Sequence, residues 1–536
     1  MPEYEHVSEP LYAGGNHFTP TGGRSCRNIA PFFEADNGMG RGVLLAVGWT
    51  GQWFAHFQKE GENIHIRAGV DGLSFYLKPK EKIRTASVLL LPYDNGTAAA
   101  HNAFRRIMVE HFSVYPDEKL GNPPLSMQTW GGAKSEFLKR QIQKADAEKL
   151  GFEYFWVDAG WYGDYEEYCP DEFVGKWGNY TGDWQVNRRV HPGGLKDVFS
   201  LAKEKGMKGL LWFEPERVCK CSEFYKNHRE MVLECKADSW NSLLNLAKDE
   251  VKEFMLETSS RYIEELGLSC YRQDFNFDPL PFWDEADEEG RKGITQIRYI
   301  TALYEILDTL RARFPHLVID NCASGGNRID IEMCSRSIPL WRSDTNCDFD
   351  FNADYAQNQQ VGLSAWVPYH GCGTSRFVDD VYKFRSCYGA ALASNFLGYE
   401  AFGTAPYDFD TVRFLLDEYK SVRHLFAKDF YPVFGAPLDS YAWSGWQFHD
   451  SETEEGVVEA FRRPNALQDS ATVYLGGLKD DASYEFFNSD TKEKFVYSGK
   501  ILNSEGFTVV LKNRRSSALF RYKALKEKKR GYQKNR

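Results

Sequence analysis

Eight short apolar segments alternate with longer helical stretches through the middle of the chain, and this alternation restricts the possible folds more than any other feature. The segments are SMQTWGG (126–132), FEYFWVDAGW (152–161), MKGLLWFEPERV (207–218), SLLNLA (242–247), LSCYRQDFN (268–276), LVIDNCASGG (317–326), IPLWRSD (338–344) and LSAWVPY (363–369). Stretches such as 134–151, 194–206 and 294–314 carry apolar residues at helical spacing. Eight strand and helix repeats predict an α/β fold, a (β/α)8 TIM barrel over residues 121–428.

Short β-rich runs separated by turns flank the predicted barrel on both sides. Those between residues 41 and 93 predict an N-terminal antiparallel β domain, which with a linking helix takes up residues 1–120. Those after residue 428 predict a small C-terminal antiparallel β-sandwich over residues 429–525, followed by a basic tail at 526–536. Three units agree with a chain of 536 residues, at roughly 100 to 200 residues per domain.

Charge and composition exclude several classes of partner. The net charge of −11 argues against nucleic acid, because nucleic-acid binders need a basic field, and we interpret the basic tail as solvated chain. There is no run of 18 apolar residues and no signal peptide, so we expect a soluble protein without a membrane partner. Eleven cysteines, an odd number spread along the chain, indicate reduced thiols and a cytoplasmic location.

Cofactor and metal motifs are missing from the sequence. Cys219 and Cys221 form an isolated CxC pair without a second pair or a histidine cluster at metal-ligand spacing. No GxGxxG motif follows a strand, and the CASGG turn (322–326) lacks the lysine of a nucleotide-binding loop. We therefore expect no cofactor and no metal.

Polar residues gather where the predicted strands end. In a (β/α)8 barrel the active-site groups come from the carboxyl ends of the strands. The residues at these positions are Asp158, Trp161, Trp212, Glu214, Glu216, Arg272, Asp274, Asn276, Asp320, Cys322, Ser324, Arg328, Arg342 and Asp344. Carboxylates with tryptophans are typical of a glycosidase, and 15% aromatic residues, with 14 tryptophans, agree with sugar binding while also serving large cores.

Two of these carboxylates match the needs of glycosidic bond cleavage. The reaction requires one acid that protonates the leaving oxygen and one carboxylate that attacks or stabilises the anomeric carbon. Asp274 has Arg272 two residues earlier on the same strand face, where the cation would keep the acid ionised, and Asp344 has Arg342 in the same relation. A strand-end acid also commonly caps a helix or pairs with an arginine, and we assign Glu214 and Glu216 to such supporting roles.

Six motifs along the barrel follow one another in the order of a known enzyme family. They are VDAGW (157–161), GDWQVN (182–187), LWFEPERV (211–218), RQDFN (272–276), CASGGNR (322–328) and WRSD (341–344). In this order they resemble motifs of the family-36 glycoside hydrolases, the α-galactosidases of the melibiase type. The resemblance covers the barrel and, more loosely, both β domains, and each motif alone is weak.

This resemblance implies roles for individual residues. Asp274 matches the family's nucleophile and Asp344 its general acid/base, while Asp158 matches an aspartate that holds sugar hydroxyls. Trp184 matches a tryptophan of the sugar pocket, and Cys322 matches the cysteine near the C2 side of the sugar. The other substrate-binding residues expected from these motifs are Trp161, Arg272, Asn276, Ser324, Gly325, Arg328 and Trp341.

The chain departs from the family pattern at three positions of the expected pocket. Ala159 replaces a second aspartate, Arg272 replaces a lysine, and Ser324 replaces a glycine close to where the C2 substituent of the sugar would lie. Arginine and lysine are not equivalent where a planar fork can bind two oxygens. These changes indicate a modified sugar pocket.

The leading hypothesis is an exo-acting, retaining α-glycosidase that removes terminal α-galactose or a C2-modified relative, α-N-acetylgalactosamine or α-galactosamine. The alternatives are a galactosyl transferase of the raffinose-synthase type, a phosphorylase that uses Arg272, Arg328 and Arg342 for phosphate, and a catalytically silent carbohydrate-binding protein. The expected partner is an oligosaccharide or glycoside. The N-terminal region is shorter than the family's β-sandwich, and Trp49 and Trp53 either pack in its core or serve a neighbour's pocket in a homo-oligomer.

Overall fold

The structure is a computed structural model that describes residues 4–12, 14–115, 117–165, 176–348, 350–374, 378–395 and 407–526. The predicted basic tail lies outside the described residues apart from Lys526. Within these residues, no helix combines the length and the apolar character that crossing a membrane would require.

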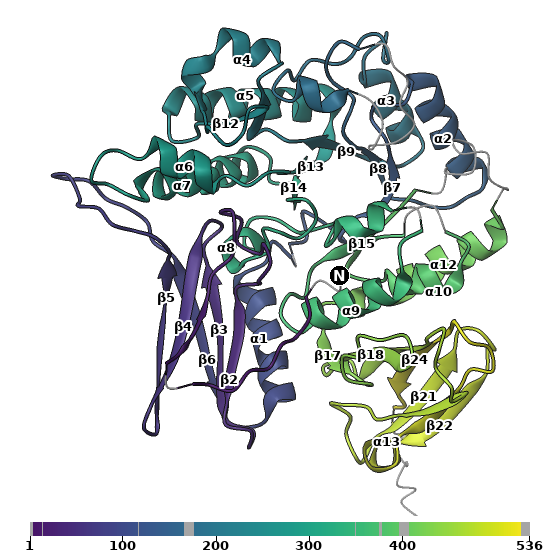
Figure 1. Cartoon of the computed structure of the whole chain (residues 1–536). Coiled ribbons are helices and arrows are strands. Elements are labelled where there is room, and N and C mark those ends of the chain that lie inside the picture. Colours follow the sequence, from purple (N-terminus) through teal and green to yellow (C-terminus); the bar gives the residue numbers. More distant parts are fainter. Residues whose placement is uncertain are drawn as a thin grey trace, which may run out of the picture.

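The N-terminal part consists of two three-stranded antiparallel sheets and one long helix, drawn in purple and dark blue in Figure 1. The sheets have the strand orders β1-β4-β5 and β2-β3-β6. Their elements are β1 (Asn16–Phe18), β2 (Phe32–Asp36), β3 (Gly42–Gly48), β4 (Trp53–Glu60), β5 (Asn63–Val70), β6 (Ser87–Tyr93) and α1 (Thr97–His111). Trp49 and Trp53 are completely buried, and their indoles donate to Gln296 and to the carbonyl of Ser25, so both serve the core.

Seven parallel strands form a curled sheet at the centre of the molecule. In spatial order they are β14 (Val318–Asn321), β13 (Leu268–Gln273), β9 (Lys208–Phe213), β8 (Tyr154–Val157), β7 (Leu125–Thr129), β16 (Ala391–Ser394) and β15 (Gly371–Gly373). The segment 338–342 lies between the two edges. Ile338 pairs in parallel with Asp320 of β14, and the amide of Arg342 donates to the carbonyl of Gly371 of β15 over 3.2 Å. This segment supplies the eighth position, and the predicted TIM-barrel fold is confirmed.

Two of the eight predicted strands were wrong. Segment 242–247 overlaps β12 (Asn241–Leu244), which pairs with β10 (Arg217–Cys219) and β11 (Val232–Leu233) in a small antiparallel sheet beside the barrel. Segment 363–369 covers the end of helix α9 and the turn after it. β13 is therefore the fourth barrel strand, and segment 338–342 is the sixth. An apolar run of this length fits a side sheet as well as a barrel, whereas β15 and β16 consist mostly of Gly and Ala and give no hydrophobic pattern.

Helices cover the outside of the barrel. The long ones are α2 (Ser135–Ala147), α3 (Lys196–Glu204), α5 (Asp249–Leu266), α7 (Ile294–Arg313), α9 (Ala353–Ser364) and α12 (Phe409–Val422). The short ones are α4 (Glu223–Asn227), α6 (Leu280–Ala286), α8 (Ile331–Cys334), α10 (Val381–Ser386), η1 (Trp177–Tyr180), η2 (Arg229–Met231), η3 (Asp344–Cys347) and η4 (Arg423–Leu425). The predicted stretches 134–151, 194–206 and 294–314 contain α2, α3 and α7 as their apolar spacing requires.

The C-terminal part is a six-stranded antiparallel sheet with a two-stranded ribbon, drawn in yellow-green in Figure 1. Its strands, in spatial order, are β17 (Asp429–Pro432), β18 (Trp443–Asp450), β19 (Glu455–Arg462), β24 (Ser516–Ala524), β21 (Ser483–Asn488) and β22 (Lys494–Ser498). The ribbon joins β20 (Ser470–Val473) and β23 (Phe507–Val510), and α13 (Gly499–Ser504) precedes β23. The buried Arg105 of α1 donates to the carbonyls of Phe426 (2.9 Å) and Lys428 (2.7 Å), which links α1 to the start of this sheet.

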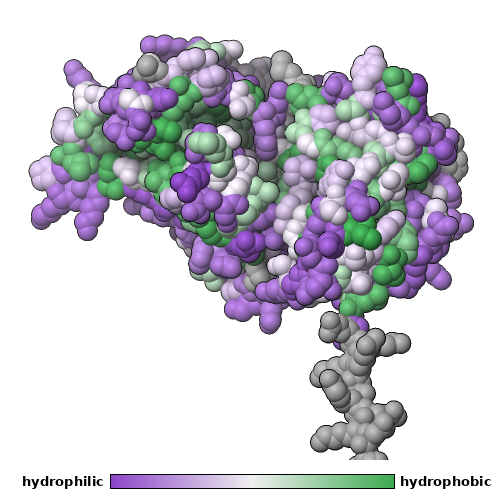
Figure 2. Space-filling view, turned by 90° about the horizontal axis from the view of Figure 1, so that it is seen from below, coloured by the Kyte–Doolittle hydropathy of each residue, from purple (hydrophilic) through white to green (hydrophobic). Residues whose placement is uncertain are grey.

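The surface is mixed in polarity. Figure 2 shows one face of the molecule, on which apolar patches lie among polar side chains. Single apolar side chains on a protein surface are common. The exposed apolar residues include Val88 and Leu90 of β6 and Tyr474 after β20.

Glu459 of β19 makes the stability of the protein depend on pH. The carboxyl is completely buried, and burial raises its pKa from 4.5 to about 8, although Trp446 donates to it over 3.1 Å. Since the folded state prefers the protonated acid, the free energy of unfolding should fall by about 3 kcal/mol from pH 5 to pH 8. In urea unfolding, Glu459→Gln should remove this part of the fall. The control Glu455→Gln, on the same strand, should retain it; an unchanged profile in Glu459→Gln contradicts the prediction.

Candidate active site

The carboxyl ends of neighbouring strands hold the candidate residues on one edge of the sheet. Main-chain hydrogen bonds continue the sheet up to this edge: Asp158 donates to Thr129, Asp274 to Phe213 and Cys322 to Gln273, over 2.7 to 2.8 Å. The strands concerned lie side by side in Figure 1. The side chains of Asp158, Asp274 and Cys322 therefore start from a fixed backbone.

Asp274 is a buried carboxylate that accepts four hydrogen bonds. Its Oδ1 accepts from the backbone amides of Phe275 (2.7 Å) and Ser324 (3.2 Å). Its Oδ2 accepts from Trp212 Nε1 (3.1 Å) and Asn276 Nδ2 (3.0 Å). Four donors from three different strand ends fix the orientation of both oxygens.

The pKa of Asp274 is lower than its ordinary value although the group is buried. Burial alone would raise the pKa of this carboxyl, but the positive charge of Arg272 and the hydrogen bonds from Asn276 and Phe275 lower it by more. Asp274 is thus held as an anion in a mostly dry site, where a carboxylate can act as a nucleophile.

Arg272 acts on Asp274 through its charge. Its guanidinium donates to Asp320, lies 3.8 Å from Asp158 and stacks over the ring of Trp156 at 4.4 Å. From its position two residues before Asp274 on the same strand face, Arg272 was expected to favour the ionised acid, and its charge does lower the pKa of Asp274. The direct ion-pair partners of Arg272 are Asp320 and Asp158. A guanidinium can serve two carboxylates at once, which an ammonium does less well.

Asp158 is a second buried acid of the site, and its pKa is shifted in the opposite direction to that of Asp274. Its Oδ1 accepts from the amide of Ala159 (2.8 Å), and its Oδ2 accepts from Trp156 (2.7 Å). Burial and the negative charge of Asp274 raise the pKa of Asp158, although Arg272 lowers it in part. Asp158 therefore takes up a proton more readily than Asp274 does.

Asp344 is the exposed acid of the site. It begins η3, directly after Ser343, whose hydroxyl caps that short helix by accepting from the amide of Thr345. Burial raises the pKa of the Cys322 thiol, and the negative charges of Asp274 and Asp344 raise it further, although Arg272 lowers it in part. Cys322 thus lies within range of the charges of a buried acid and an exposed acid.

The loop after β14 fits closely against the backbone that carries Asp344. Gly325 has φ +76°, and a Cβ there would lie 2.7 Å from Cα of Ser343 and 2.8 Å from the amide of Asp344. A glycine at this position permits the close approach. Ser324 also has a positive φ, +49°, and its hydroxyl donates to Asn276 over 3.0 Å. Gly325 therefore shapes the site through its backbone.

The three tryptophans predicted to bind substrate are buried side chains. Trp161 is completely buried, donates to the carbonyl of Trp212 over 2.8 Å and packs against Trp184, which is 4% exposed. Trp341 is 3% exposed and meets Trp156 edge to face. Trp161 and Trp184 belong to the core that includes Tyr262 of α5, whereas Trp341 and Trp156 belong to a separate core. Trp212 is the tryptophan that contacts Asp274.

Three other charged residues predicted near the rim, Arg328, Glu214 and Glu216, are buried in ion pairs. Arg328 forms a two-pronged ion pair with Glu216, at 2.6 and 3.0 Å, and lies over the ring of Phe275. Glu214 pairs with Arg217 and accepts from the amide of Asn276. The supporting roles expected for both glutamates agree with these contacts.

Arg342 is placed differently from its expected position beside Asp344. It is completely buried and donates to Gln360 and to the carbonyl of Ala356. Because η3 begins at Asp344, residues 342–344 do not continue a strand. The expectation that Arg342 would lie beside Asp344 on one strand face is therefore wrong. Arg272, Arg328 and Arg342 each have their own buried partners, so they form no common phosphate site.

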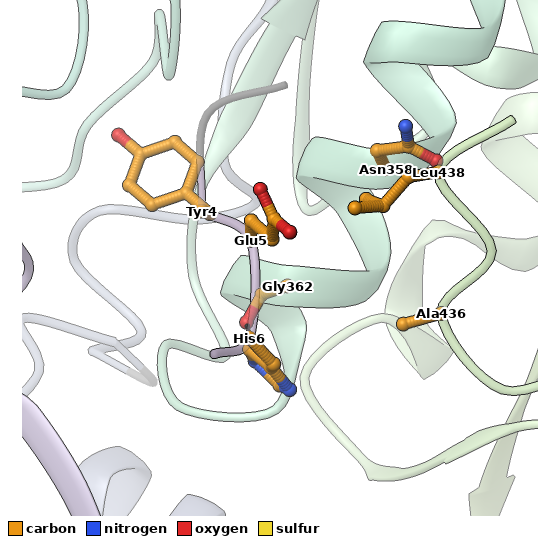
Figure 3. A pocket seen from close by; sticks show the side chains of 7 residues that line it. All are labelled: Tyr4, Glu5, His6, Asn358, Gly362, Ala436 and Leu438. Carbon is orange, nitrogen blue, oxygen red and sulfur yellow. Dashed lines mark hydrogen bonds between the residues drawn. The ribbon is translucent and has the colours of Figure 1, made fainter. Parts of the chain in front are cut away.

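A small cavity is lined by none of the residues predicted for the site. Its volume is about 30 Å³, and Figure 3 shows that it lies between the N-terminal segment, α9 and the loop after β17; it is lined by Tyr4, Glu5, His6, Asn358, Gly362, Ala436 and Leu438. The hydroxyl of Tyr4 donates to the carbonyl of Arg342 over 2.9 Å. This volume suits a water molecule rather than a sugar.

The sequence interpretation missed two residues that contact the site. Trp212 stood among the strand-end residues without a role, yet it donates directly to Asp274. Arg24 comes from the N-terminal part and contacts Ser324, 300 positions away in the sequence. No local pattern in the sequence marks such a contact.

Comparisons with known proteins agree with this arrangement. The melibiase family matches residues 90–370. The chain is 24% identical to alpha-galactosidase 1 of Pediococcus pentosaceus, over 83% of this chain and 60% of that protein. It is 25% identical to alpha-galactosidase Mel36A of Lactobacillus acidophilus, over 93% of this chain and 68% of that protein. The chain thus spans about 60 to 68% of the length of these relatives.

Solved structures share the fold. A variant of the GH36 alpha-galactosidase AgaA of Geobacillus stearothermophilus, crystallised with raffinose, superposes with a TM-score of 0.81 at 21% identity. The match covers 96% of this chain and 72% of that chain. The family match extends over more than half of the sequence and contains all the barrel strands except β15 and β16. The resemblance found in the motifs is confirmed, and the chain belongs to the melibiase family.

Proposed function

We propose that the protein is an exo-acting, retaining α-glycosidase that hydrolyses terminal α-galactosyl residues or their C2-modified relatives. The observation that carries the proposal is the pair of unlike acids around Cys322, in which Asp274 is buried and anionic and Asp344 is exposed. A double-displacement hydrolase needs such a pair, because one carboxylate must stay ionised while the other exchanges protons with solvent. Family membership and relatives named alpha-galactosidase support the same reaction.

The proposed reaction has two steps. Asp274 attacks the anomeric carbon, and the bond to the leaving oxygen breaks as Asp344 gives that oxygen its proton. A water molecule then attacks the anomeric carbon of the glycosyl ester, Asp344 takes its proton, and Asp274 is released as a carboxylate. Together the two steps return the enzyme to its starting state, with Asp344 protonated and Asp274 ionised.

The other residues of the site would hold the sugar. Asp158 and Cys322 are our candidates for contacts with sugar hydroxyls, because their polar groups lie beside Asp274. Ala159 has no polar side chain, and Ser324 adds a hydroxyl where the family motif has glycine. We infer a pocket that differs from that of ordinary α-galactosidases near C2 of the sugar, and an oligosaccharide as the substrate, in line with the raffinose complex of AgaA.

The substrate proposal can be tested with p-nitrophenyl α-glycosides. Galactoside, N-acetylgalactosaminide and galactosaminide are compared by kcat/KM under the same conditions. A higher kcat/KM on a C2-amino sugar would mean that Ala159 and Ser324 mark a changed specificity. A higher kcat/KM on the galactoside would mean that these two residues do not alter the preference for galactose. Release from none of the three contradicts the proposal. NMR of the first-formed sugar should show the α anomer; a β anomer would exclude retention.

A further inference from the structure

A short N-terminal segment, residues 22–26, is seated on the barrel next to Asp274. The carbonyl of Gly22 accepts from the amide of Leu280 over 3.0 Å, and the amide of Cys26 donates to the carbonyl of Asn327 over 2.8 Å. Glycine is required for this fit: a Cβ on Gly22 would lie 2.4 Å from the carboxyl carbon of Asp278. The segment therefore bridges the loops that follow β13 and β14.

Arg24 is the centre of this segment, and its side chain enters the wall of the site. The residue is 2% exposed although it precedes the barrel by 100 positions. Its Nε and Nη2 donate to Asp278 over 3.0 and 2.8 Å. Its Nη1 reaches the carbonyls of Phe275 (3.2 Å) and Ala323 (3.3 Å) and the hydroxyl of Ser324 (3.0 Å). One guanidinium thus holds both loops that supply donors to Asp274.

The first link from Arg24 to Asp274 runs through a single peptide group. The carbonyl of Ala323 accepts from Arg24, and the amide on the other side of that peptide, on Ser324, donates to Asp274 Oδ1. Because the peptide is planar, its carbonyl and its amide point in opposite directions. Arg24 therefore fixes the plane that aims this amide at the carboxylate.

The second link is a chain of side-chain hydrogen bonds with a defined direction. A guanidinium can only donate, so the hydroxyl of Ser324 accepts from Arg24 and has its own proton left to donate to Asn276 Oδ1. The amide of Asn276 is thereby oriented with its NH2 group toward Asp274 Oδ2, at 3.0 Å. Hydrogen bonds in such a chain strengthen one another.

We propose that Arg24 is a positioning residue for Asp274, acting through the peptide of Ala323 and through the relay Ser324 to Asn276. The N-terminal region is then part of the active site. The relay needs a hydroxyl at position 324, where the family motif has glycine, so it belongs to this chain and not to the motif. The inference rests on the proposed function, in which Asp274 is the nucleophile.

The test compares Arg24→Met and Ser324→Gly with a control, Arg27→Met. Arg27 directly follows this segment and lies 3.7 Å from the same Asp278. Its side chain is 40% exposed and has no hydrogen bond to the two loops in the described structure. Ser324→Gly removes the hydroxyl at a positive φ without strain and changes no charge. Rates and KM are measured from pH 4 to 9 on the p-nitrophenyl glycoside that the unaltered protein cleaves best.

For Arg24→Met we expect kcat to fall roughly 10- to 100-fold with KM almost unchanged, because the carboxylate loses its orientation. The acidic limb of kcat/KM should move to higher pH in both Arg24→Met and Ser324→Gly, since an anion with weaker donors takes up a proton more readily. The double variant should have the same kcat and the same acidic limb as Arg24→Met alone, because Ser324 acts on Asp274 through the relay that loss of Arg24 already breaks. Arg27→Met should keep the unaltered profile.

Unchanged kinetics in the variants would contradict the positioning role of Arg24. A folded Arg24→Met or Ser324→Gly variant with a lower Tm but an unchanged kcat and acidic limb would make Arg24 a purely structural residue. If Arg24→Met does not fold, Ser324→Gly decides alone. Asp274→Asn is measured beside them. Turnover that survives in Asp274→Asn overturns the proposed function, whereas an inactive Asp274→Asn with unaltered Arg24→Met kinetics overturns only the positioning role.

Discussion

Replacement of Asp274 by asparagine should reduce kcat on every α-glycoside by roughly 10⁴-fold or more, because no other group takes over the attack on the anomeric carbon. The fold should survive. Asparagine has nearly the same shape, and its amide oxygen can keep two of the four present donors, those from Phe275 and Ser324. Circular dichroism and thermal unfolding verify the fold, and p-nitrophenol release measures the rate.

Asp284→Asn is the control for this prediction. Asp284 lies on α6, which follows the same loop, and its side chain is exposed. It should retain most of the activity. Asp274→Ala gives a sharper result, because the space left by the carboxylate admits azide, which should restore turnover and yield the β-glycosyl azide. An α-glycosyl azide, or Asp274→Asn activity within tenfold of the unaltered protein, would remove Asp274 from the nucleophile role.

The position of Asp274 was predictable because the barrel geometry is simple. Parallel strands place their carboxyl ends on one edge, so a polar residue that closes an apolar run has few other places to lie. Which segments form the barrel strands, and in what order, was not predictable. β12 has the apolar run expected of a barrel strand but pairs within a side sheet, and β16 (ALAS) is recognisable only from its parallel partners β7 and β15.

The contacts of three arginines, Arg272, Arg342 and Arg24, show how far the sequence predicts side-chain direction. Arg272 precedes Asp274 on a continuous strand, and its charge acts on Asp274 as alternation predicts. Arg342 precedes Asp344 at the point where a strand becomes a 3-10 helix, and its side chain turns into the core. Arg24 depends on a contact across 250 residues. Side-chain direction follows from sequence only while the backbone stays regular.

Replacement of Asp344 by asparagine should produce a loss that depends on the leaving group. With an alkyl galactoside or an oligosaccharide, whose leaving oxygen needs a proton, kcat/KM should fall by roughly 10³-fold or more. With a 2,4-dinitrophenyl glycoside, whose leaving group departs without a proton, the first step should remain fast and the covalent intermediate should accumulate. A burst of dinitrophenol followed by slow turnover is the expected signal.

The anomer of the glycosyl azide that forms distinguishes the roles of the two acids. In Asp344→Asn azide should attack the glycosyl ester on Asp274 without needing a base, which speeds the second step and gives the α-glycosyl azide, the opposite anomer to that from Asp274→Ala. Asp348→Asn, an exposed acid directly after the same short helix, should behave like the unaltered protein. An equal loss of activity on good and poor leaving groups would contradict the acid/base role, because a group that transfers the proton must matter more as the leaving oxygen becomes more basic.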